Sequence, residues 1–568
     1  MARPERGAPP LSNAEIAKVL LGLAQLLAVQ KANPFKVRAY RRAAKAIANT
    51  GDSIDELVRR GADLTTIPGI GSAIAGAIRE IVERGGALRQ LEALRAGADE
   101  HTAALSDYPL LDPKRVARIY KKLEISSIQE LKERLERGDI GRLMGVRMEH
   151  HVRQALSPGT EMLLYEADQI VPPIREFLLE QCGAERVEAA GDYRRRVEII
   201  HEISFLVQTT DFANVVEAFR RYGGRITIIS ADATSASFQH PSGLRVRVMG
   251  SPARLWGLSL IVATGSDAHL AKLEEAGHAL LALARGREGF KTEAAVYRKL
   301  GLAPIPAEMR EGYDEVERAA AGRLPDLITT ADIQGELHAH TVASDGTQTI
   351  ERMAEAARKR GYEYLGITDH SQSLKIARGV PEATLWDQIR FIDRLNEGGT
   401  LGIRILKSAE VDILADGRLD YSDAVLKELD YTICSIHSRF ALDRKGQTER
   451  IMRAMENRYF TILGHATGRQ LLRRPGYHVD FERIVEQARQ NGCFFEINAS
   501  PDRLDLSAAN ARFAVEAGVK IAINTDAHST GELDFVRYGV DQARRAGLER
   551  SSVLNCLSAD EIVRTLRR

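Results

Sequence analysis

Cysteine and long hydrophobic runs are scarce in this sequence. Its 568 residues include four cysteines, none in a CxxC pair: Cys182, Cys434, Cys493 and Cys556. This usage excludes a disulfide scaffold or a zinc ribbon and is typical of a reducing compartment. The longest apolar run, residues 19–29, contains a glutamine and is too short to cross a bilayer, so it predicts a buried helix. The N-terminus has no signal-peptide pattern, and we expect a cytoplasmic protein without a membrane partner.

Net charge is also almost absent. Lysine and arginine total 79 and aspartate and glutamate total 78, which gives +1. This balance lacks the basic surplus that is usual in nucleic-acid-binding proteins. The surplus is local, however, because residues 1–150 contain 25 basic and 19 acidic side chains, whereas the remaining chain is more acidic. The sequence therefore predicts a basic N-terminal region in a protein whose total charge is close to zero.

Length and hydrophobic periodicity divide the chain into several domains. At about 100–200 residues per domain, this length corresponds to roughly three to five domains. Helical spacing of apolar residues is clearest over residues 14–30, 37–48 and 54–60. The segments expected as strands in the middle of the chain are 186–190, 198–207, 225–230 and 244–249. After residue 334, short apolar runs alternate with helices, which predicts parallel strands and favours a closed β/α barrel.

Histidines and carboxylates recur at the ends of the predicted C-terminal strands. They are His338, His340, Asp345, His370, Glu410, His437, His465, Asp526 and His528. The carboxyl ends of barrel strands meet at one mouth, so six separate segments deliver these groups to one place. A single histidine at a strand end is usually a core or surface residue, but six with three matched acids are not explained by chance. Nitrogen and oxygen donors without thiolate predict a hydrolytic cluster of zinc, manganese or iron.

With these motifs, residues 335–529 resemble the PHP (polymerase and histidinol phosphatase) phosphoesterases. The resemblance implies a (β/α)7-type barrel, three divalent ions, and catalytic and metal-binding roles for all nine side chains. It would assign His338, His340, Glu410 and Asp526 to one ion, Glu410, His437 and His465 to a second, and Asp345, His370 and His528 to a third. Such ions lower the pKa of a bound water and neutralise phosphate oxygens during displacement.

Three basic residues follow the ligand-bearing segments closely along the chain. Lys375, Arg439 and Arg469 are therefore candidates for binding the phosphate of a substrate, because lysine and arginine donate charge-assisted hydrogen bonds to phosphate oxygens. Taken singly, each is explained as easily by a solvated surface charge. We predict that these three side chains lie next to the metal cluster and bind phosphate there.

The sequence Ile67-Pro68-Gly69-Ile70-Gly71 has the pattern of a helix-hairpin-helix turn. Gly69 and Gly71 allow a tight turn whose backbone N–H groups can meet a DNA phosphate. A basic helix precedes the turn, and its candidate DNA-binding side chains are Lys36, Arg38, Tyr40 and Arg41. Basic groups beside a stacking ring suit a DNA end or a single strand. The alternative is an amphipathic helix that buries Tyr40 in the core.

The order of these parts resembles the bacterial family X DNA polymerases that end in a PHP domain. The resemblance covers nearly the whole chain and implies a multidomain α+β and α/β protein with a nucleotidyltransferase-like palm and thumb. It implies a lyase-like helix-hairpin-helix domain at 1–95, a fingers-like helical domain at 96–158 and a palm at 159–252. A thumb-like region with a linker would follow at 253–332, and the PHP domain at 333–568.

The palm motif departs from that family where synthesis would take place. The family reads G-S-x-R-R-G and then a D-x-D metal pair, whereas this chain has Asp192 at the serine and Glu202 and Ser204 at the two aspartates. Arg247 occupies the position of a third aspartate. Two-metal nucleotidyl transfer needs these carboxylates, so we expect neither a magnesium site nor synthesis at the palm.

The complete hydrolase ligands and the altered palm together favour one function. We expect a metal-dependent 3′→5′ DNA exonuclease or 3′-end phosphoesterase of DNA repair, associated with the nucleoid and acting on 3′ ends, gaps or single-stranded tails. Three alternatives stay open. They are an active family X polymerase with a 3′→5′ exonuclease in base excision repair, a non-catalytic scaffold at DNA ends, and a small-molecule phosphatase. The hairpin favours DNA over a small molecule, and the complete ligand set argues against a scaffold.

Overall fold

Residues 10–98, 100–108, 111–156, 161–278, 280–286 and 288–566 are described by the computed structural model. They form two compact units, of which the first ends at Pro304. The second unit starts at Ile305 and also includes the short segment Arg196–Glu198. Residues 305–332 thus group with the barrel, since the backbone N–H of Ile328 donates to the carbonyl of Leu548 at 3.1 Å. The finer five-part division stays a prediction from the sequence.

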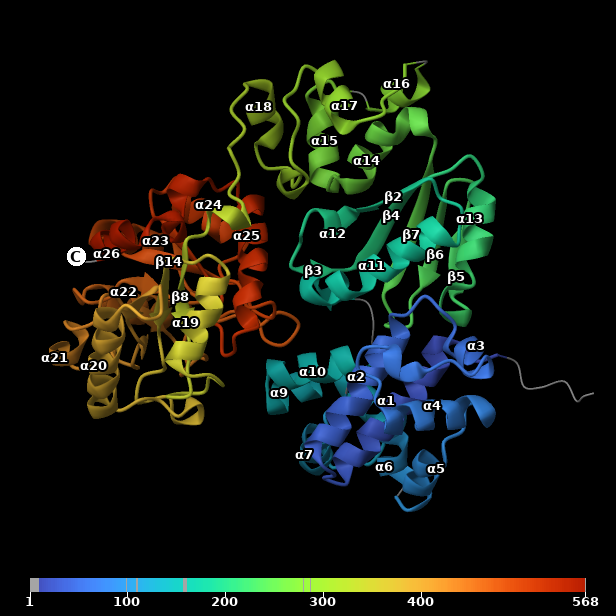
Figure 1. Ribbon diagram of the computed structural model, residues 1–568, viewed down its shortest axis with the longest axis horizontal. Coiled ribbons are helices and arrows are strands. Elements are labelled where there is room, and N and C mark those ends of the chain that lie inside the picture. Colours follow the sequence, from blue (N-terminus) through green and yellow to red (C-terminus); the bar gives the residue numbers. More distant parts are fainter. Residues whose placement is uncertain are drawn as a thin grey trace, which may run out of the picture. The chain divides into compact units, whose positions relative to one another are not determined.

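Helices make up the N-terminal part of the first unit (Figure 1). They are α1 (Asn13–Val29), α2 (Pro34–Ala48), α3 (Ile54–Arg59), α4 (Ser72–Glu83) and α5 (Arg89–Ala96). Their apolar faces share one buried cluster that includes Leu20, Ile47 and Ile78, so the predicted buried helix at 19–29 is part of α1. α1 begins with a capping box, in which Ser12 and Glu15 satisfy two backbone N–H groups at the helix start.

A second group of helices has an apolar core of its own. These helices are α6 (Glu100–Ala104), α7 (Pro113–Leu123), α8 (Ile128–Glu136), α9 (Asp139–Met144) and α10 (Val146–Leu156). Leu111, Ile119 and Leu131 belong to this core. α7 begins at Asp112, whose carboxylate accepts a hydrogen bond from the backbone N–H of Arg115 and so caps the helix.

A mixed five-stranded sheet follows in the first unit, with the order β2-β4-β7-β6-β5. The strands are β2 (Arg186–Ala190), β4 (Glu202–Gln208), β5 (Thr227–Ala231), β6 (Ser235–Gln239) and β7 (Arg245–Ser251). β4 and β7 run parallel, and the other neighbours are antiparallel. The flanking elements are β1 (Met162–Leu163), β3 (Ile199–Ile200), α11 (Leu164–Glu180), α12 (Gly191–Arg194) and α13 (Phe212–Phe219). β6 was not predicted, because its sequence SASFQ is mostly small and polar.

Four further helices complete the first unit. They are α14 (Trp256–Thr264), α15 (Asp267–Glu275), α16 (Leu280–Arg285) and α17 (Glu293–Lys299). Arg194 of α12 ties α17 to the sheet, because its guanidinium donates to both carboxylate oxygens of Glu293 at 2.8 and 2.7 Å. Over the described parts of both units, no helix is long and apolar enough to cross a membrane.

Parallel strands alternate with helices in the second unit, as predicted (Figure 1). The strands are β8 (Gly335–Ala339), β9 (Tyr364–Ile367), β10 (Arg404–Lys407), β11 (Glu410–Asp412), β12 (Ile433–Ser435), β13 (Ile462–Leu463), β14 (Phe494–Asn498) and β15 (Ile521–Asn524). The helices are α18 (Glu315–Ala320), α19 (Ile350–Lys359), α20 (Glu382–Gly398), α21 (Asp423–Leu426), α22 (Arg444–Met455), α23 (Phe481–Asn491), α24 (Ala508–Glu516), α25 (Val536–Arg545) and α26 (Ala559–Leu566).

Backbone hydrogen bonds join these strands into a ring. One part has the order β10-β9-β8 and the other β11-β12-β13-β14-β15. Beside β8 and β15, the backbone N–H of His340 donates to the carbonyl of Ala527 at 2.8 Å. Beyond β9, the N–H of Ser371 donates to the carbonyl of Glu410 in β11 at 2.9 Å. β10 and β11 share one strand position, and the fold is the expected (β/α)7-type barrel.

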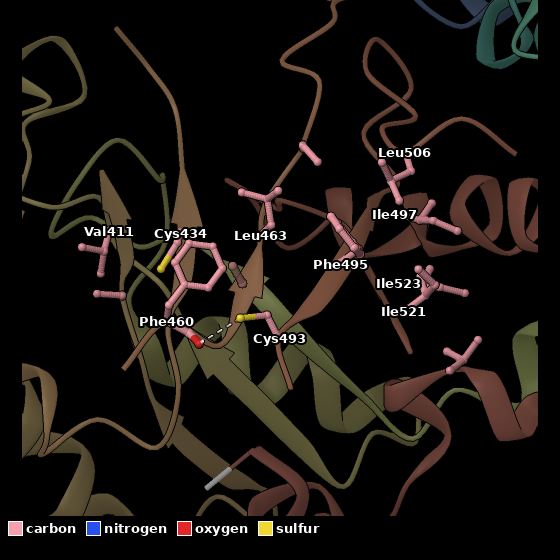
Figure 2. Packing of buried hydrophobic residues seen from close by; sticks show 14 of the residues in the cluster. Val411, Cys434, Phe460, Leu463, Cys493, Phe495, Ile497, Leu506, Ile521 and Ile523 are labelled. Carbon is pink, nitrogen blue, oxygen red and sulfur yellow. Dashed lines mark hydrogen bonds between the residues drawn. The ribbon is translucent and has the colours of Figure 1, made fainter. Parts of the chain in front are cut away.

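Buried apolar side chains pack the barrel strands against the helices. Figure 2 shows part of this cluster, in which Val411, Cys434, Leu463 and Phe495 come from successive strands. Cys434 and Cys493 are buried and are not joined in a disulfide, in agreement with the expectation that this chain has no disulfide framework. Because side chains alternate along a strand, the same strands can bury an apolar residue here and present a polar one to the opposite face.

Candidate metal centre in the barrel

The nine predicted metal-binding side chains lie at the carboxyl ends of the barrel strands. His338 lies in β8, His340 directly follows that strand, and Asp345 is in the next loop. His370 follows β9, Glu410 begins β11, His437 follows β12, His465 follows β13, and Asp526 and His528 follow β15. All nine are buried or half-buried. His465 and Asp526 have φ angles of +26° and +55°, which strain the backbone of a residue other than glycine and recur at functional sites.

Glu410 lies at the centre of this group. Its side chain is 1% exposed and has five imidazoles within 3.7 Å. Nε2 of His465 is 2.9 Å and Nε2 of His437 is 3.3 Å from the same carboxylate oxygen, Oε1. The imidazoles near the other oxygen, Oε2, are those of His338, His340 and His370, at 3.6, 3.7 and 2.7 Å. One carboxylate therefore joins imidazoles that four different strands deliver.

Ligand atoms gather within 4.8 Å of one another in three overlapping sets. The sets are His340, Asp345, His370 and His528; His338, His340 and Asp526; and His370, Glu410 and His437. Eight of the nine predicted ligands occur in them, and His465 joins through its contact with Glu410. The arrangement implied by the family resemblance differs at His370, which here lies beside Glu410 as well as Asp345.

Several buried atoms of the site have no hydrogen-bond partner among the described residues. They include Nε2 of His338, Nδ1 of His370 and Oε2 of Glu410. Nδ1 of His370 is 2.7 Å from Oε2 of Glu410, yet the two do not meet the geometry of a hydrogen bond. Buried polar atoms are almost always satisfied, so these lone pairs call for a shared cation. Nitrogen and oxygen donors without thiolate fit a divalent metal, and PHP domains are metal-dependent, so this cluster could hold such an ion.

The charges of the site depend strongly on one another. Burial raises the pKa of Glu410, but His370 and His437 outweigh this effect and hold the pKa well below its ordinary value. Burial lowers the pKa of His437, yet Glu410 and Asp412 raise it to about 9. At His340, burial and the neighbouring His370 lower the pKa to about 4. Glu410 therefore stays ionised at neutral pH and His437 is protonated, so a metal ion would displace a proton from His437 when it binds.

Two carboxylates that the sequence analysis did not identify hold the imidazoles in place. Nδ1 of His338 donates to Glu496 at 2.7 Å, and Nδ1 of His437 donates to Asp412 at 2.5 Å. Each bond fixes the ring so that Nε2 faces the centre. Glu496 is fully buried in β14, and a charged residue inside an apolar strand is the signal that could have identified it. Asp412 shares β11 and one strand face with Glu410.

Arg503 is a basic residue of the site that the sequence analysis also missed. It lines a cavity of about 210 Å³ together with Asp526 and His528, and its side chain is 18% exposed. Its Nε is 3.5 Å from Oδ2 of Asp526. Arg503 follows β14 in a loop without helical or strand periodicity, so no sequence pattern placed it at the barrel mouth. The structure thus brings a guanidinium beside the metal-binding side chains.

Of the three predicted phosphate-binding residues, Arg469 is committed to other partners. Its guanidinium donates to the backbone carbonyls of Arg503, at 3.0 Å, and Leu504, and to the carboxylate of Glu198 at 3.0 Å. The prediction for Arg469 is therefore corrected, because these contacts use its guanidinium to hold the loop that carries Arg503. Lys375 and Arg439 are exposed, and their role stays a prediction.

The hairpin region presents its basic side chains but not its predicted aromatic ring. Lys36, Arg38 and Arg41 are exposed on α2. Tyr40 is 6% exposed and packs into the apolar core, so its predicted stacking on DNA is wrong and the amphipathic alternative holds. The exposed ring is Phe35 at the start of α2, with the guanidinium of Arg38 4.6 Å from its centroid.

The turn before α4 has the backbone that the hairpin pattern predicts. Gly69 has φ of +92°, a value that favours glycine, and a side chain added there would meet Arg42 at 3.2 Å. Gly71 is the N-cap residue of α4 and has open space around it. The first backbone N–H groups of α4 have no side-chain cap at Gly71, so they are available to a ligand such as phosphate.

The altered palm residues lie together on β4 and β7. Ser204 and Arg247 are direct partners across the two strands, and the hydroxyl of Ser204 donates to Glu202 at 3.0 Å. Asp192 accepts a hydrogen bond of 2.6 Å from Arg195. Within the described residues, no set of ligand atoms suitable for a metal includes these positions. Glu202 is thus the one carboxylate left where the family has a cluster of aspartates, and Arg247 occupies another of those positions.

Known protein families match segments near both ends of the chain. A family model described as a helix-hairpin-helix domain matches residues 11–87, and a PHP domain model matches residues 336–500. Two relatives called probable phosphatases match the barrel region at similar identity. One from Thermoanaerobacter sp. strain X514 is 30% identical over 39% of this chain and 89% of its own length. Another from Caldanaerobacter subterraneus is 31% identical over 34% of this chain and 75% of its own length.

One relative covers both units. It is the DNA polymerase/3′-5′ exonuclease PolX of Bacillus subtilis, 33% identical over 98% of this chain and 99% of its own length. PHP domains are metal-dependent hydrolases, and the matched segment begins at the strand that carries His338 and His340. The order of hairpin, sheet and barrel in the two units is the order expected from the family resemblance. The chain therefore belongs to the PolX family, the bacterial family X DNA polymerases with a C-terminal PHP domain.

Proposed function

We propose that this protein is a metal-dependent 3′→5′ DNA exonuclease whose chemistry takes place in the barrel. The observation that carries the proposal is the convergence of nine nitrogen and oxygen side chains, with Glu410 at their centre. In the palm, by contrast, Glu202 is the one carboxylate left at the three metal positions, and Arg247 occupies another of them. The Bacillus subtilis relative is called a polymerase and a 3′-5′ exonuclease, and the barrel favours the second of these activities for this chain.

The metal centre is proposed to hold three ions of manganese, zinc or iron. His338, His340, Glu410 and Asp526 would hold one, Glu410, His437 and His465 a second, and Asp345, His370 and His528 a third. Bound ions would supply a water of lowered pKa and neutralise the oxygens of the scissile phosphate. Glu496 and Asp412 keep the imidazoles of His338 and His437 oriented for this task.

Arg503 is proposed to bind the scissile phosphate beside the metal centre. Its guanidinium is a fixed, planar donor that matches two phosphate oxygens, and it is held at the cavity by Asp526. This position would orient the phosphodiester for in-line attack and leave the metal-binding side chains in place. Lys375 and Arg439, both exposed, are proposed to contact the flanking phosphates of the strand.

DNA is proposed to bind through the hairpin region of the first unit. Lys36, Arg38 and Arg41 supply exposed positive charge on one helix, and Phe35 supplies an exposed ring for a base. The substrates would be 3′ ends, gaps or single-stranded tails, which also implies a place at the nucleoid in the cytoplasm. Polymerisation is proposed to be lost, because Asp192 would repel a triphosphate and Arg247 would repel a metal ion.

A small-molecule phosphatase is the second candidate. Two relatives that match the barrel are called probable phosphatases, and most of their length lies within it. Those matches cover less than half of this chain, whereas the hairpin domain lies in the other unit and has DNA-binding chemistry. The DNA substrate is therefore preferred.

Substitution of two central ligands tests the exonuclease. His340→Ala and Glu410→Ala are expected to remove Mn²⁺-dependent shortening of a 5′-labelled strand and to lower the bound metal content. DNA binding measured by fluorescence anisotropy should stay within about twofold, because the hairpin region is unchanged. Arg247→Ala serves as the control and should shorten DNA at the wild-type rate. Shortening that persists in both ligand variants would overturn the assignment of the site.

A further inference from the structure

A loop of nine residues, 371–379, leaves the barrel directly at the metal centre. Both of its ends are held at His370, because the N–H of Val380 donates to the carbonyl of His370 at 2.8 Å and Ser371 pairs with Val380. The N–H of Ser371 also donates to the carbonyl of Glu410 at 2.9 Å. The ends approach so closely that a side chain on Gly379 would meet the carbonyl oxygen of Ser371 at 2.0 Å. The loop therefore has a fixed root on two ligands of the site.

The loop is also held along its length. The hydroxyl of Ser373 donates to Asp412 at 2.7 Å, and Asp412 in turn orients the ring of His437. The N–H of Ser373 donates to Asp420 at 2.7 Å. A 3₁₀ turn at Lys375–Ala377 follows, and Ala377 is buried beneath it. These contacts make the loop a firm projection whose tip has a defined place relative to the metal centre.

The tip of this loop presents an isoleucine to solvent between two cations. Ile376 is 94% exposed, and Lys375 and Arg378 beside it are exposed as well. An isoleucine costs free energy in water when a fold could bury it, and the loop instead buries its small neighbour Ala377. The combination of an apolar tip with flanking positive charge matches a strand of nucleic acid, which offers base faces between phosphates.

The tip lies within reach of the nucleotides next to the reacting phosphate. Ile376 is three positions after Ser373, which touches Asp412, and three positions of extended chain span at most about 11 Å. Successive nucleotides of a strand in duplex DNA rise by about 3.4 Å, so this distance corresponds to roughly three base steps. Side chains such as isoleucine are used as wedges that enter a base step and unstack it.

We propose that Ile376 is a wedge that unstacks the 3′-terminal base pair of a duplex and frees the terminal strand for the metal centre. Lys375 and Arg378 would hold the phosphates on either side of the opened step. The inference rests on the proposed exonuclease and adds a substrate to it, since a wedge matters for paired 3′ ends and not for single strands. DNA is the occupant proposed for this surface. A tip that binds a protein instead would leave the DNA readouts below unchanged when Ile376 is replaced.

A fluorescence measurement without catalysis tests the wedge. The full-length protein is mixed in EDTA with a duplex that carries 2-aminopurine as its 3′-terminal base, and anisotropy establishes that the DNA is saturated. Wild type is expected to increase 2-aminopurine emission several-fold, because the base leaves the stack. Ile376→Ser should lose most of this increase at equal saturation, and Ile376→Leu should keep it. The matched control is Ile229→Ser, which removes an exposed isoleucine of the first unit and should behave as wild type.

Hydrolysis in Mn²⁺ supplies the second readout. Ile376→Ser should digest a single strand at the wild-type rate and a paired 3′ end at least about tenfold more slowly. The wedge is overturned if Ile376→Ser and wild type give the same emission and the same ratio of duplex to single-strand rates. A wild-type protein that raises the emission but hydrolyses neither DNA would support the wedge and overturn the proposed exonuclease.

Discussion

At the scale of single residues, the candidate metal centre is arranged by side chains outside the set of predicted ligands. Glu410 gathers the imidazoles, but those rings are aimed by Glu496 and Asp412, which accept their Nδ1 hydrogens. The backbone supports the same arrangement, since the N–H of His465 donates to Glu496 at 2.8 Å. One buried carboxylate thus positions two ligands from two different strands, which makes it a sensitive place to test the site.

Glu496→Gln is expected to weaken metal binding by about 10–100-fold and to lower exonuclease activity to a similar degree, because the ring of His338 loses its anionic partner. Isothermal titration with Mn²⁺ measures the affinity. Glu486→Gln is the control, since Glu486 is an exposed residue of α23 that pairs with Arg489. Equal Mn²⁺ affinity in Glu496→Gln and wild type would show that this carboxylate does not orient a ligand.

His240 is expected to make the first unit less stable in acid. Burial lowers its pKa to about 4, against 6.5 for the exposed group, so the folded protein keeps the imidazole neutral. The stabilisation from the neutral imidazole is fully present above pH 6.5 and is lost as the pH falls toward 4. The loss at pH 4 amounts to about 3 kcal/mol. Between pH 7 and pH 5 we expect a loss of about 2 kcal/mol from this group.

Urea unfolding of wild type and His240→Asn at the two pH values measures this contribution. Asparagine can keep the acceptor that Nδ1 offers to the backbone N–H of Ser242, at 3.1 Å, but does not titrate. The variant should therefore lose about 2 kcal/mol less than wild type between pH 7 and pH 5. Equal losses in the two proteins would rule out His240 as the source of the acid sensitivity.

At the scale of elements, the barrel loops carry the ligands and depend on close backbone contacts. Gly346 follows Asp345, and a side chain at this position would meet the backbone carbonyl of His340 at 2.7 Å. Gly346→Ala should therefore displace the loop, cost about 1–3 kcal/mol of stability and lower the number of metal ions bound. Elemental analysis of the purified protein measures the ion content. Gly531→Ala, in open space in the same unit, should leave both quantities unchanged, and an unchanged ion content in Gly346→Ala would contradict the role of this loop.

The sequence predicts the elements well where apolar periodicity is strong. The expected helix at 37–48 lies within α2, and the expected strand at 186–190 coincides with β2. β6 escapes because SASFQ lacks the β-branched residues that mark its neighbours. The short apolar run at 404–410 is divided into β10 and β11, so Glu410 can begin a new strand next to His370. Strand periodicity cannot reveal such a break.

The candidate site divides in the same way between predictable and unpredictable parts. Ligands at strand ends could be identified because histidine and acid after an apolar run have few structural explanations. The place of Arg503 at the barrel mouth could not be identified, because it depends on how a loop folds back. The choice between an exposed and a buried Tyr40 could not be settled either, because it depends on which helix face meets the core. Arg469 looked suitable by position alone, but backbone carbonyls take its hydrogen bonds.

At the scale of the whole molecule, the DNA contacts proposed for the hairpin region and the hydrolysis proposed for the barrel belong to separate units and should respond separately to substitution. Replacing Lys36, Arg38 and Arg41 together by alanine should reduce the slope of log K against log salt by about 0.9 for each lost phosphate contact. Hydrolysis of a small phosphodiester such as bis(p-nitrophenyl) phosphate should stay at the wild-type rate. A control with the same number of exposed basic residues removed from the first unit is Arg60→Ala, Arg89→Ala and Arg220→Ala. A salt slope that falls equally in the control would show that α2 is not the DNA-binding helix.

This PolX-family protein is proposed to remove nucleotides in the barrel and to add none in the palm. Incubation of the wild-type protein with Mn²⁺, all four dNTPs and a 5′-labelled primer–template tests both activities in one reaction. We expect primers that shorten one nucleotide at a time, and primers of unchanged length when Glu410→Ala replaces wild type. Primers that grow along the template, in either protein, would contradict this proposal.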